Sequence, residues 1–124
     1  MERDTSKSII QPDLYNCMFS EVMIGKRGDH VFEARSHFTY NANTKKFQKL
    51  WIDSEHGWMV LYEGNKEEGL VVFMTEIMIR DQIIKFRHRY YLEGQDSFSM
   101  FSERSLDGGE NWITTWEIHY KRQP

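Results

Sequence analysis

Apolar and polar residues alternate along most of this chain. The clearest case is the segment 83–92, in which one face is largely apolar and aromatic and the other face is basic. The first face comprises Ile84, Phe86, His88, Tyr90 and Leu92, and the second comprises Lys85, Arg87 and Arg89. A period of two places successive side chains on opposite faces of an extended chain, so this pattern predicts a half-buried β-strand.

Turn-forming residues interrupt the apolar segments at regular intervals. Glycine, asparagine and aspartate, which tolerate positive φ or hydrogen bond to their own backbone, recur in seven short clusters. The segments between the clusters are rich in Val, Ile, Phe, Tyr, Trp and Thr, which is the composition of strands. We therefore expect eight strands, at about 14–26, 30–40, 45–53, 57–63, 69–79, 83–93, 96–105 and 110–121.

The connections between these segments are short, so successive strands should pair as antiparallel neighbours. An open sheet leaves two unpaired edges, whereas closure into a barrel removes both. A barrel of eight strands is just wide enough to hold one small ligand. We expect an all-β fold with little or no helix, an eight-stranded antiparallel up-and-down barrel at 14–124. Residues 1–13 are polar and contain Pro12, so they should form an N-terminal arm that is mobile or ordered only by packing.

The composition and charge of the chain argue against several classes of function. The chain has 124 residues and a mass of 15.0 kDa, with 16 Lys and Arg residues, 19 Asp and Glu residues and a net charge of −3. This acidic balance, with dispersed basic residues, argues against nucleic-acid binding. We find no secretory signal pattern and no apolar segment long enough for a membrane span. Cys17 alternates with Tyr15 and Phe19 and has no nucleophile signature around it, so we expect a buried structural thiol. As the single cysteine it cannot form an internal disulfide, so we expect a cytoplasmic protein.

The segment 69–79 departs from the alternation because both of its faces are apolar. One face carries Val71, Phe73, Ile77 and Ile79, and the other carries Leu70, Val72, Met74 and Met78. Another part of the chain or a second subunit must cover the outer face, since exposed apolar patches of this extent usually mark an interface. We expect a homodimer through this strand.

The C-terminal half contains a characteristic series of motifs. Arg87 is followed by Glu103-Arg104-Ser105-Leu106-Asp107-Gly108-Gly109-Glu110-Asn111-Trp112 and by Tyr120-Lys121-Arg122. The series resembles the Arg…Glu-x-Ser-x-Asp-Gly-Gly-x-x-Trp…Tyr-x-Arg signature of small uncharacterised bacterial proteins, the domain-of-unknown-function family fifteen seventy-nine. Upstream, Tyr40-Asn41 and Trp51-Ile52-Asp53-Ser54 resemble further segments of that family. The resemblance covers roughly residues 31–122, most of the chain, and implies a calycin-like, lipocalin-like barrel without an established activity.

The Asp107-Gly108-Gly109 loop contains residue types that also occur in phosphate-binding and calcium-binding loops. A phosphate-binding loop is followed by a helix, and a calcium loop has alternating carboxylates that end in a bidentate glutamate. Neither pattern is present. We therefore expect a hairpin turn that uses glycine at positive φ.

Arg87 and Glu103 lie on strands joined by the turn near Gly94, so a cross-strand pair is expected. If both side chains point into the barrel, they are candidates to anchor a polar group of a ligand. If they face solvent, they form a stripe of weak salt bridges. Lipid-binding proteins with similar barrels hold a carboxylate with buried arginines and a tyrosine, and the resemblance implies that role for Arg87, Arg89 and Tyr91.

The aromatic content and the prospect of a closed barrel favour a binding function. We expect a non-enzymatic domain that binds a small amphipathic or anionic ligand, with no catalytic residue, no metal and no cofactor. The cavity is predicted to be lined by Trp51, Phe86, Arg87, His88, Glu103, Trp112 and Trp116.

Two alternatives remain open. The first is a small cytoplasmic enzyme in which His88 acts as a general base and Arg87 polarises a carbonyl or holds a carboxylate. The second is a dimeric structural or interaction domain whose core is filled by its own side chains. The five histidines lack the close spacing of zinc ligands, so no metal site is expected.

Overall fold

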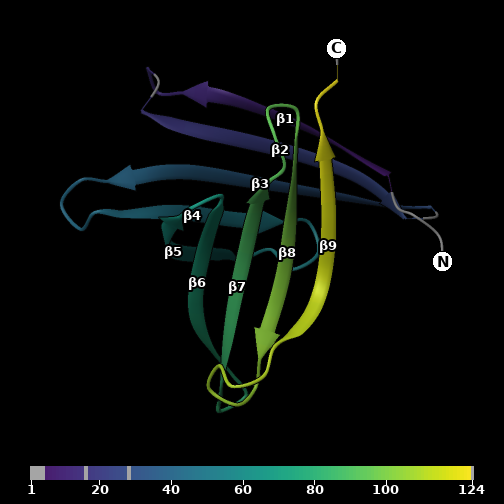
Figure 1. Cartoon of the computed structure of the whole chain (residues 1–124). Coiled ribbons are helices and arrows are strands. Elements are labelled where there is room, and N and C mark those ends of the chain that lie inside the picture. The colour runs from purple at the N-terminus through teal and green to yellow at the C-terminus, as the bar shows by residue number, and fades with distance from the viewer. Residues whose placement is uncertain (1–4, 16, 28, 124) are drawn as a thin grey trace. The chain divides into compact units, whose positions relative to one another are not determined.

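A computed structural model describes residues 5–15, 17–27 and 29–123 of the chain. These residues form nine strands and no helix, which confirms the all-β prediction (Figure 1). The strands are β1 (Thr5–Asp13), β2 (Met18–Arg27), β3 (His30–Asn41), β4 (Lys46–Asp53), β5 (Met59–Glu67), β6 (Leu70–Ile79), β7 (Gln82–Leu92), β8 (Ser97–Ser105) and β9 (Ile113–Lys121). A helix capable of crossing a membrane is not found in this part of the chain.

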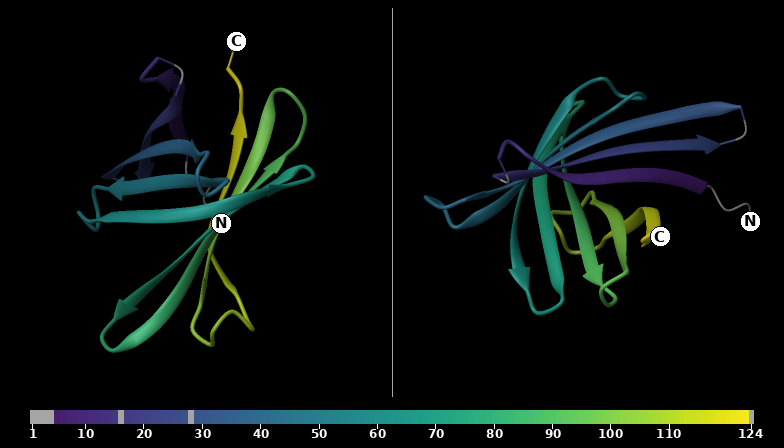
Figure 2. Two further views of the ribbon diagram at one scale, coloured as in Figure 1. Left: turned by 90° about the vertical axis from the view of Figure 1, so that its left-hand side faces the viewer. Right: turned by 90° about the horizontal axis from the view of Figure 1, so that it is seen from above.

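The strands belong to two compact units, Met1–Leu61 and Tyr62–Pro124. The first unit contains β1 to β4 and the start of β5, and the second contains the rest of β5 and β6 to β9. Within each unit, strands that follow one another in the chain pair antiparallel. The prediction of antiparallel up-and-down strands is therefore confirmed. In the second unit the β6–β7 and β8–β9 turns lie at the same end (Figure 1 and Figure 2).

The strand that the sequence pattern does not predict is β1. Its residues pair with β2, from Thr5 opposite Lys26 to Asp13 opposite Met18. Proline occurs in strands where its missing N–H is not needed by the ladder, so it does not exclude this segment from the sheet. The count of eight strands is therefore wrong, because residues 5–13 of the expected N-terminal arm form a strand. The rest of that arm, residues 1–4, lies outside the described residues.

The second unit buries the face of its strands that carries His88. Tyr62, Phe73 and Met100 are buried on the same face, and the Tyr62 and His88 rings stack with their centroids 4.4 Å apart. Gly64 permits a close approach of β5 to β6, since a Cβ at this position would lie 2.0 Å from the carbonyl oxygen of Val72. The backbones of these two strands therefore meet at a distance that only glycine allows.

Strand β6 has one buried and one partly exposed apolar face. Phe73 is 4% exposed, whereas Met74 and Met78 on the opposite face are 41% and 67% exposed. The outer apolar face expected from the sequence is therefore present. The homodimer through this strand stays a prediction.

The first unit buries one face of β2, β3 and β4. Its apolar residues include Met23, Ala34 and Trp51. Cys17 lies in the turn between β1 and β2 and is exposed, so the expectation of a buried thiol is wrong. The physical reason is that the second strand begins at Met18, which leaves Cys17 outside the alternation of the strand.

Candidate ligand-binding site

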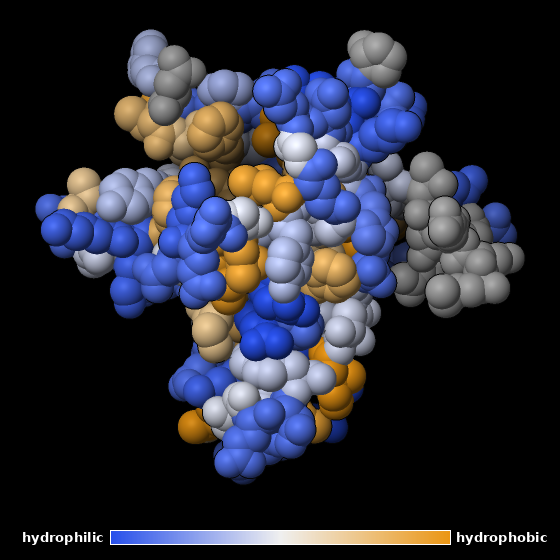
Figure 3. Space-filling model, in the orientation of Figure 1, coloured by the Kyte–Doolittle hydropathy of each residue, from blue (hydrophilic) through white to orange (hydrophobic). Residues whose placement is uncertain are grey.

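Alternation along β7 and β8 brings six side chains onto one face of the second unit. The two strands pair in register, with Arg87 directly opposite Glu103, so the expected cross-strand pair is confirmed. The face comprises Arg87, Arg89 and Tyr91 of β7 and Ser99, Phe101 and Glu103 of β8. Hydrophilic and hydrophobic residues are interspersed over the visible side of these strands in Figure 3.

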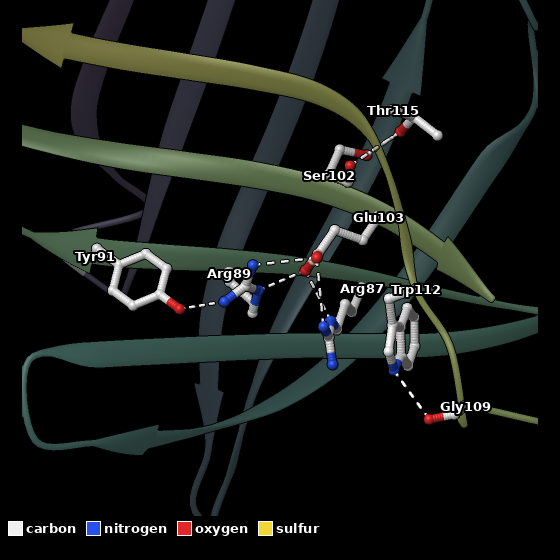
Figure 4. Close-up of polar contacts among 8 residues, drawn as sticks. All are labelled: Arg87, Arg89, Tyr91, Ser102, Glu103, Gly109, Trp112 and Thr115. Atoms are coloured by element: carbon white, nitrogen blue, oxygen red, sulfur yellow. Dashed lines mark hydrogen bonds and ion pairs between the residues drawn. The ribbon is translucent and has the colours of Figure 1, made fainter.

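Both arginines bind the same carboxylate (Figure 4). Arg87 donates from Nε to Oε1 of Glu103 at 2.8 Å and from Nη2 to Oε2 at 3.3 Å. Arg89 donates from Nη2 to Oε2 at 3.1 Å, and its Nε also donates to Oε1. The Glu103 side chain is 6% exposed, so these hydrogen bonds replace the hydration that it loses on burial.

This network keeps Glu103 in its carboxylate form. Burial raises the pKa of Glu103, but the hydrogen bonds and charges of Arg87 and Arg89 outweigh burial, so the pKa lies below its usual value. The hydrogen bond with Glu103 in turn raises the pKa of Arg89. Two guanidinium groups face one carboxylate, which leaves an excess of one positive charge within the network.

Aromatic rings lie against the two guanidinium groups. The Cζ atom of Arg87 is 3.9 Å from the centroid of the Trp112 ring. The Cζ atom of Arg89 is 5.3 Å from the Tyr91 centroid and 5.4 Å from the Phe101 centroid, and Arg89 also donates to the Tyr91 hydroxyl. Stacking on rings limits the movement of a guanidinium while its N–H groups stay able to bind in the plane.

The β8–β9 turn holds Trp112 in place. Asp107 accepts hydrogen bonds from the Asn111 backbone N–H at 2.9 Å, from Asn111 Nδ2 at 2.7 Å and from Ser105 Oγ at 2.8 Å. These bonds, the backbone bond most strongly, lower the pKa of Asp107 to about 2. Gly109 has a φ of 96°, and its carbonyl accepts a hydrogen bond from Trp112 Nε1 at 3.1 Å. The predicted hairpin turn with glycine at positive φ is therefore confirmed.

An open pocket of about 470 Å³ adjoins the network at Arg89. It is lined by Arg89, Tyr91, Glu93, Ser99, Phe101 and His119. Tyr91 separates Arg89 from Glu93 along the chain, and four residues of extended chain span about 13 Å. Arg89 and Glu93 therefore carry opposite charges at different points of the pocket wall. Tyr91, which lies between them in the sequence, supplies an aromatic ring to the same wall.

The polar groups of the pocket wall are engaged with one another. Ser99 Oγ donates to Glu93 Oε1 and lies 2.7 Å from His119 Nδ1. Because the one hydroxyl proton is directed at Glu93, it is not placed for transfer to His119, as a nucleophilic serine would require. Within the described ranges, no three His, Cys, Asp or Glu side chains converge as a metal site needs. The polar groups of the pocket wall are therefore suited to orienting a bound ligand.

The seven predicted cavity residues do not share one surface. Those that meet on the face described above are Arg87, Glu103 and Trp112. Those on the opposite face of the second unit are Phe86, His88 and Trp116, while Trp51 belongs to the first unit. Arg87 and His88 are adjacent in an extended strand, so their side chains point to opposite faces. The enzyme alternative, which needs both side chains in one pocket, therefore lacks its geometry.

Four residues of the pocket wall were not predicted from the sequence. They are Glu93, Ser99, Phe101 and His119. Three of them, Ser99, Phe101 and His119, lie on the face of β8 and β9 that continues the Arg89 face of β7. Across the strands, Phe101 pairs with Arg89 and Ser99 pairs with His119. Finding them needs the register between strands, which the alternation within one strand does not supply.

Comparison with known proteins agrees with the motifs of the C-terminal half. The model of a family described as "Protein of unknown function (DUF1579)" matches residues 12–122. No curated protein matches the chain. The family match covers nearly the whole sequence, including every residue of the arginine network and of the pocket wall. The chain therefore belongs to the DUF1579 family.

Proposed function

We propose that the protein binds a small amphipathic ligand, with an anionic group against Arg89 and Tyr91 and an aromatic or apolar part against Phe101. The observation that carries this proposal is the open pocket of about 470 Å³ beside the arginine network, in which Arg87 and Arg89 are partly buried and Glu103 is buried. Its volume falls within the roughly 300–1,000 Å³ that small-molecule sites occupy.

The charge and donors of the network support an anionic group. Arg87 and Arg89 together carry two positive charges against the single negative charge of Glu103. A guanidinium has five N–H donors, and Arg89 uses one each on Nε, Nη1 and Nη2 for Glu103 and Tyr91. Two N–H groups of Arg89 thus make no hydrogen bond within the described part of the chain and can bind a carboxylate.

The aromatic rings support an apolar part next to the anionic group. Tyr91 and Phe101 meet edge to face with their centroids 5.6 Å apart, and both line the pocket. An aromatic ligand ring can stack on such a surface while its carboxylate reaches Arg89. The Ser99 hydroxyl donates its proton to Glu93 and not to His119, so we propose binding without catalysis.

One finer expectation belongs to the same proposal. The protein acts in the cytoplasm, where its single cysteine stays reduced.

Calorimetric titration tests the binding function. Naphthalene-2-carboxylate supplies an aromatic part and an anionic group, and naphthalene-2-carboxamide is its neutral control. We expect the carboxylate to bind at least tenfold more tightly than the amide, and Arg89→Gln to remove that preference. Arg104→Gln, whose exposed side chain lies on the opposite side of β8, is the matched control and should leave both affinities unchanged. Equal affinities for the two compounds, or no binding of either, would overturn the proposal.

A further inference from the structure

The pocket wall contains a carboxylate that the proposed anion site does not use. Glu93 directly follows β7, four residues beyond Arg89, and lines the same pocket. Its Oε1 accepts the hydrogen bond from Ser99, while its Oε2 has no hydrogen bond and no ion pair within residues 5–15, 17–27 and 29–123. The lone pairs of Oε2 are therefore open to a donor on a ligand.

Hydrogen bonds hold Glu93 in the pocket wall. Its backbone N–H donates to the Ser97 carbonyl at 3.1 Å, and Ser97 Oγ lies 3.3 Å from the Glu93 carbonyl oxygen, to which it donates. Because Ser99 gives its one hydroxyl proton to Glu93, His119 Nδ1 is the donor in its 2.7 Å contact with Ser99 Oγ. This series of donors ends at the Glu93 carboxylate, so that carboxylate acts only as an acceptor.

Glu93 differs from the other carboxylates on this face of the second unit. Glu103 is bound by two arginines, and Glu117 Oε1 lies 3.2 Å from His119 Nε2. Lys121 of β9 is opposite Ser97, but in the described part of the chain it forms no ion pair with Glu93. Glu93 is therefore the carboxylate of this face that is placed to take a cation from outside the chain.

We propose that the ligand of this pocket is a zwitterion, with a protonated amine that donates to Glu93 and a carboxylate that binds Arg89. This inference rests on the proposed function, because it adds a second charged group to the same ligand. Four residues of extended chain span about 13 Å, and Tyr91 lies between the two charged residues. The geometry therefore favours a ligand whose two charges stand at opposite ends of an aromatic part, over an α-amino acid, which carries both on one carbon.

The pocket wall offers each part of such a ligand a matching group. Arg89 has two N–H groups that are not used by Glu103 or Tyr91, and they suit a carboxylate. Tyr91 and Phe101 supply ring surface for the aromatic part, and an ammonium group near a ring gains a cation–π attraction. Because Glu93 is exposed, we expect a modest gain in affinity from the amine, and one that salt weakens.

Calorimetric titration of the whole chain at pH 7.5 and low ionic strength tests the amine site. The probe is 6-(aminomethyl)naphthalene-2-carboxylate, and its uncharged match is 6-(hydroxymethyl)naphthalene-2-carboxylate. We expect the aminomethyl compound to bind at least threefold more tightly. Glu93→Gln should bring the ratio of the two affinities to about one. Glu117→Gln, which removes the same charge from the same face outside the pocket wall, should retain the ratio.

A second pair of compounds tests the separation of the charges. 2-Naphthylalanine carries its amine and its carboxylate on one carbon, so it should bind no more tightly than 3-(2-naphthyl)propanoate. If the hydroxymethyl compound binds but the aminomethyl compound gains nothing, the inference fails while the proposed function stands. A preference that survives Glu93→Gln, or one that Glu117→Gln removes equally, also overturns the inference. Binding of none of these compounds would overturn the inference and the proposed function together.

Discussion

Arg87 and Glu103 face each other directly across the β7–β8 ladder, with Arg87 Nε 2.8 Å from Glu103 Oε1. Arg89 binds the same carboxylate from the next position on that face. Glu103 is therefore the common partner of two guanidinium groups, and its loss would leave both without their counter-charge. The orientation of Arg89 toward the pocket depends on this shared carboxylate.

The first prediction concerns Glu103→Gln. The variant keeps the shape of the side chain but removes its charge, so we expect the free energy of unfolding to fall by about 2–3 kcal/mol. Urea unfolding followed by circular dichroism measures the change. The control is Glu117→Gln on β9, whose side chain is 51% exposed and whose effect should stay within about 0.5 kcal/mol. Equal effects of the two substitutions would contradict a special role for Glu103.

The second prediction concerns the pH dependence of stability. Burial lowers the pKa of Lys49 from 10.5 to about 7 in the folded chain, while the charge of Glu21 acts in the opposite direction, so between these values the unfolded state binds more protons. Stability should therefore rise with pH in this window, by up to about 1.4 kcal/mol per pH unit from this group. Lys49→Met should remove that part of the slope, and Lys46→Met should retain it. Urea unfolding at pH 7, 8 and 9 measures the slopes, and identical slopes for all three proteins would refute the prediction.

Much of the second unit could be predicted from the sequence because its strands alternate cleanly and end at turn residues. The pattern predicts strands at 83–93 and 96–105, and the structure has β7 at Gln82–Leu92 and β8 at Ser97–Ser105. The facing of Arg87 and Glu103 followed from the short turn between these strands. The alternation within each strand and the short turn between them are sufficient to predict these strands and their pairing, because both are features of residues that are close together in the sequence.

Other features depend on contacts between different strands, which the alternation of residues within one segment does not reveal. β1 is polar and includes Pro12, and it is ordered by pairing with β2. Lys49 has the position of a buried residue between Phe47 and Trp51, but its charge argues for solvent, and only its surroundings show that it is buried. The pocket wall brings Ser99 and His119 together through the register of two strands, which no single strand specifies.

The third prediction concerns the close approach of β5 and β6. A Cβ on Gly64 would lie 2.0 Å from the Val72 carbonyl oxygen, so Gly64→Ala must separate the two strands. We expect a loss of more than about 3 kcal/mol in the free energy of unfolding. Gly57→Ala is the control, because no atom lies within 4 Å of its added Cβ and only the positive φ of 72° opposes it, at about 1–2 kcal/mol. Thermal unfolding should separate the two variants clearly, and equal losses would argue against the steric explanation.

The fourth prediction concerns the outer face of β6. Met74 is 41% exposed and Phe73 is 4% exposed, so Met74→Arg changes the outer face and leaves the core intact. If two copies associate through this face, sedimentation of the wild-type protein gives twice the 15.0 kDa of one chain, and Met74→Arg gives a single chain. Asn43→Arg, in the exposed β3–β4 turn, is the control and should remain dimeric. A wild-type protein that sediments as one chain would rule out the homodimer.

The central claim is that the pocket beside the arginine network binds an anionic amphipathic ligand. Titration of the ¹⁵N-labelled protein with naphthalene-2-carboxylate, followed through the Nε–Hε signals of the arginines, tests it at the atoms that would make the contact. We predict saturable shifts of the Arg89 signal, smaller shifts for Arg87, and none for Arg104 on the opposite face of β8. Uniform small shifts of all arginine signals, or shifts equal to those caused by naphthalene-2-carboxamide, would contradict the claim.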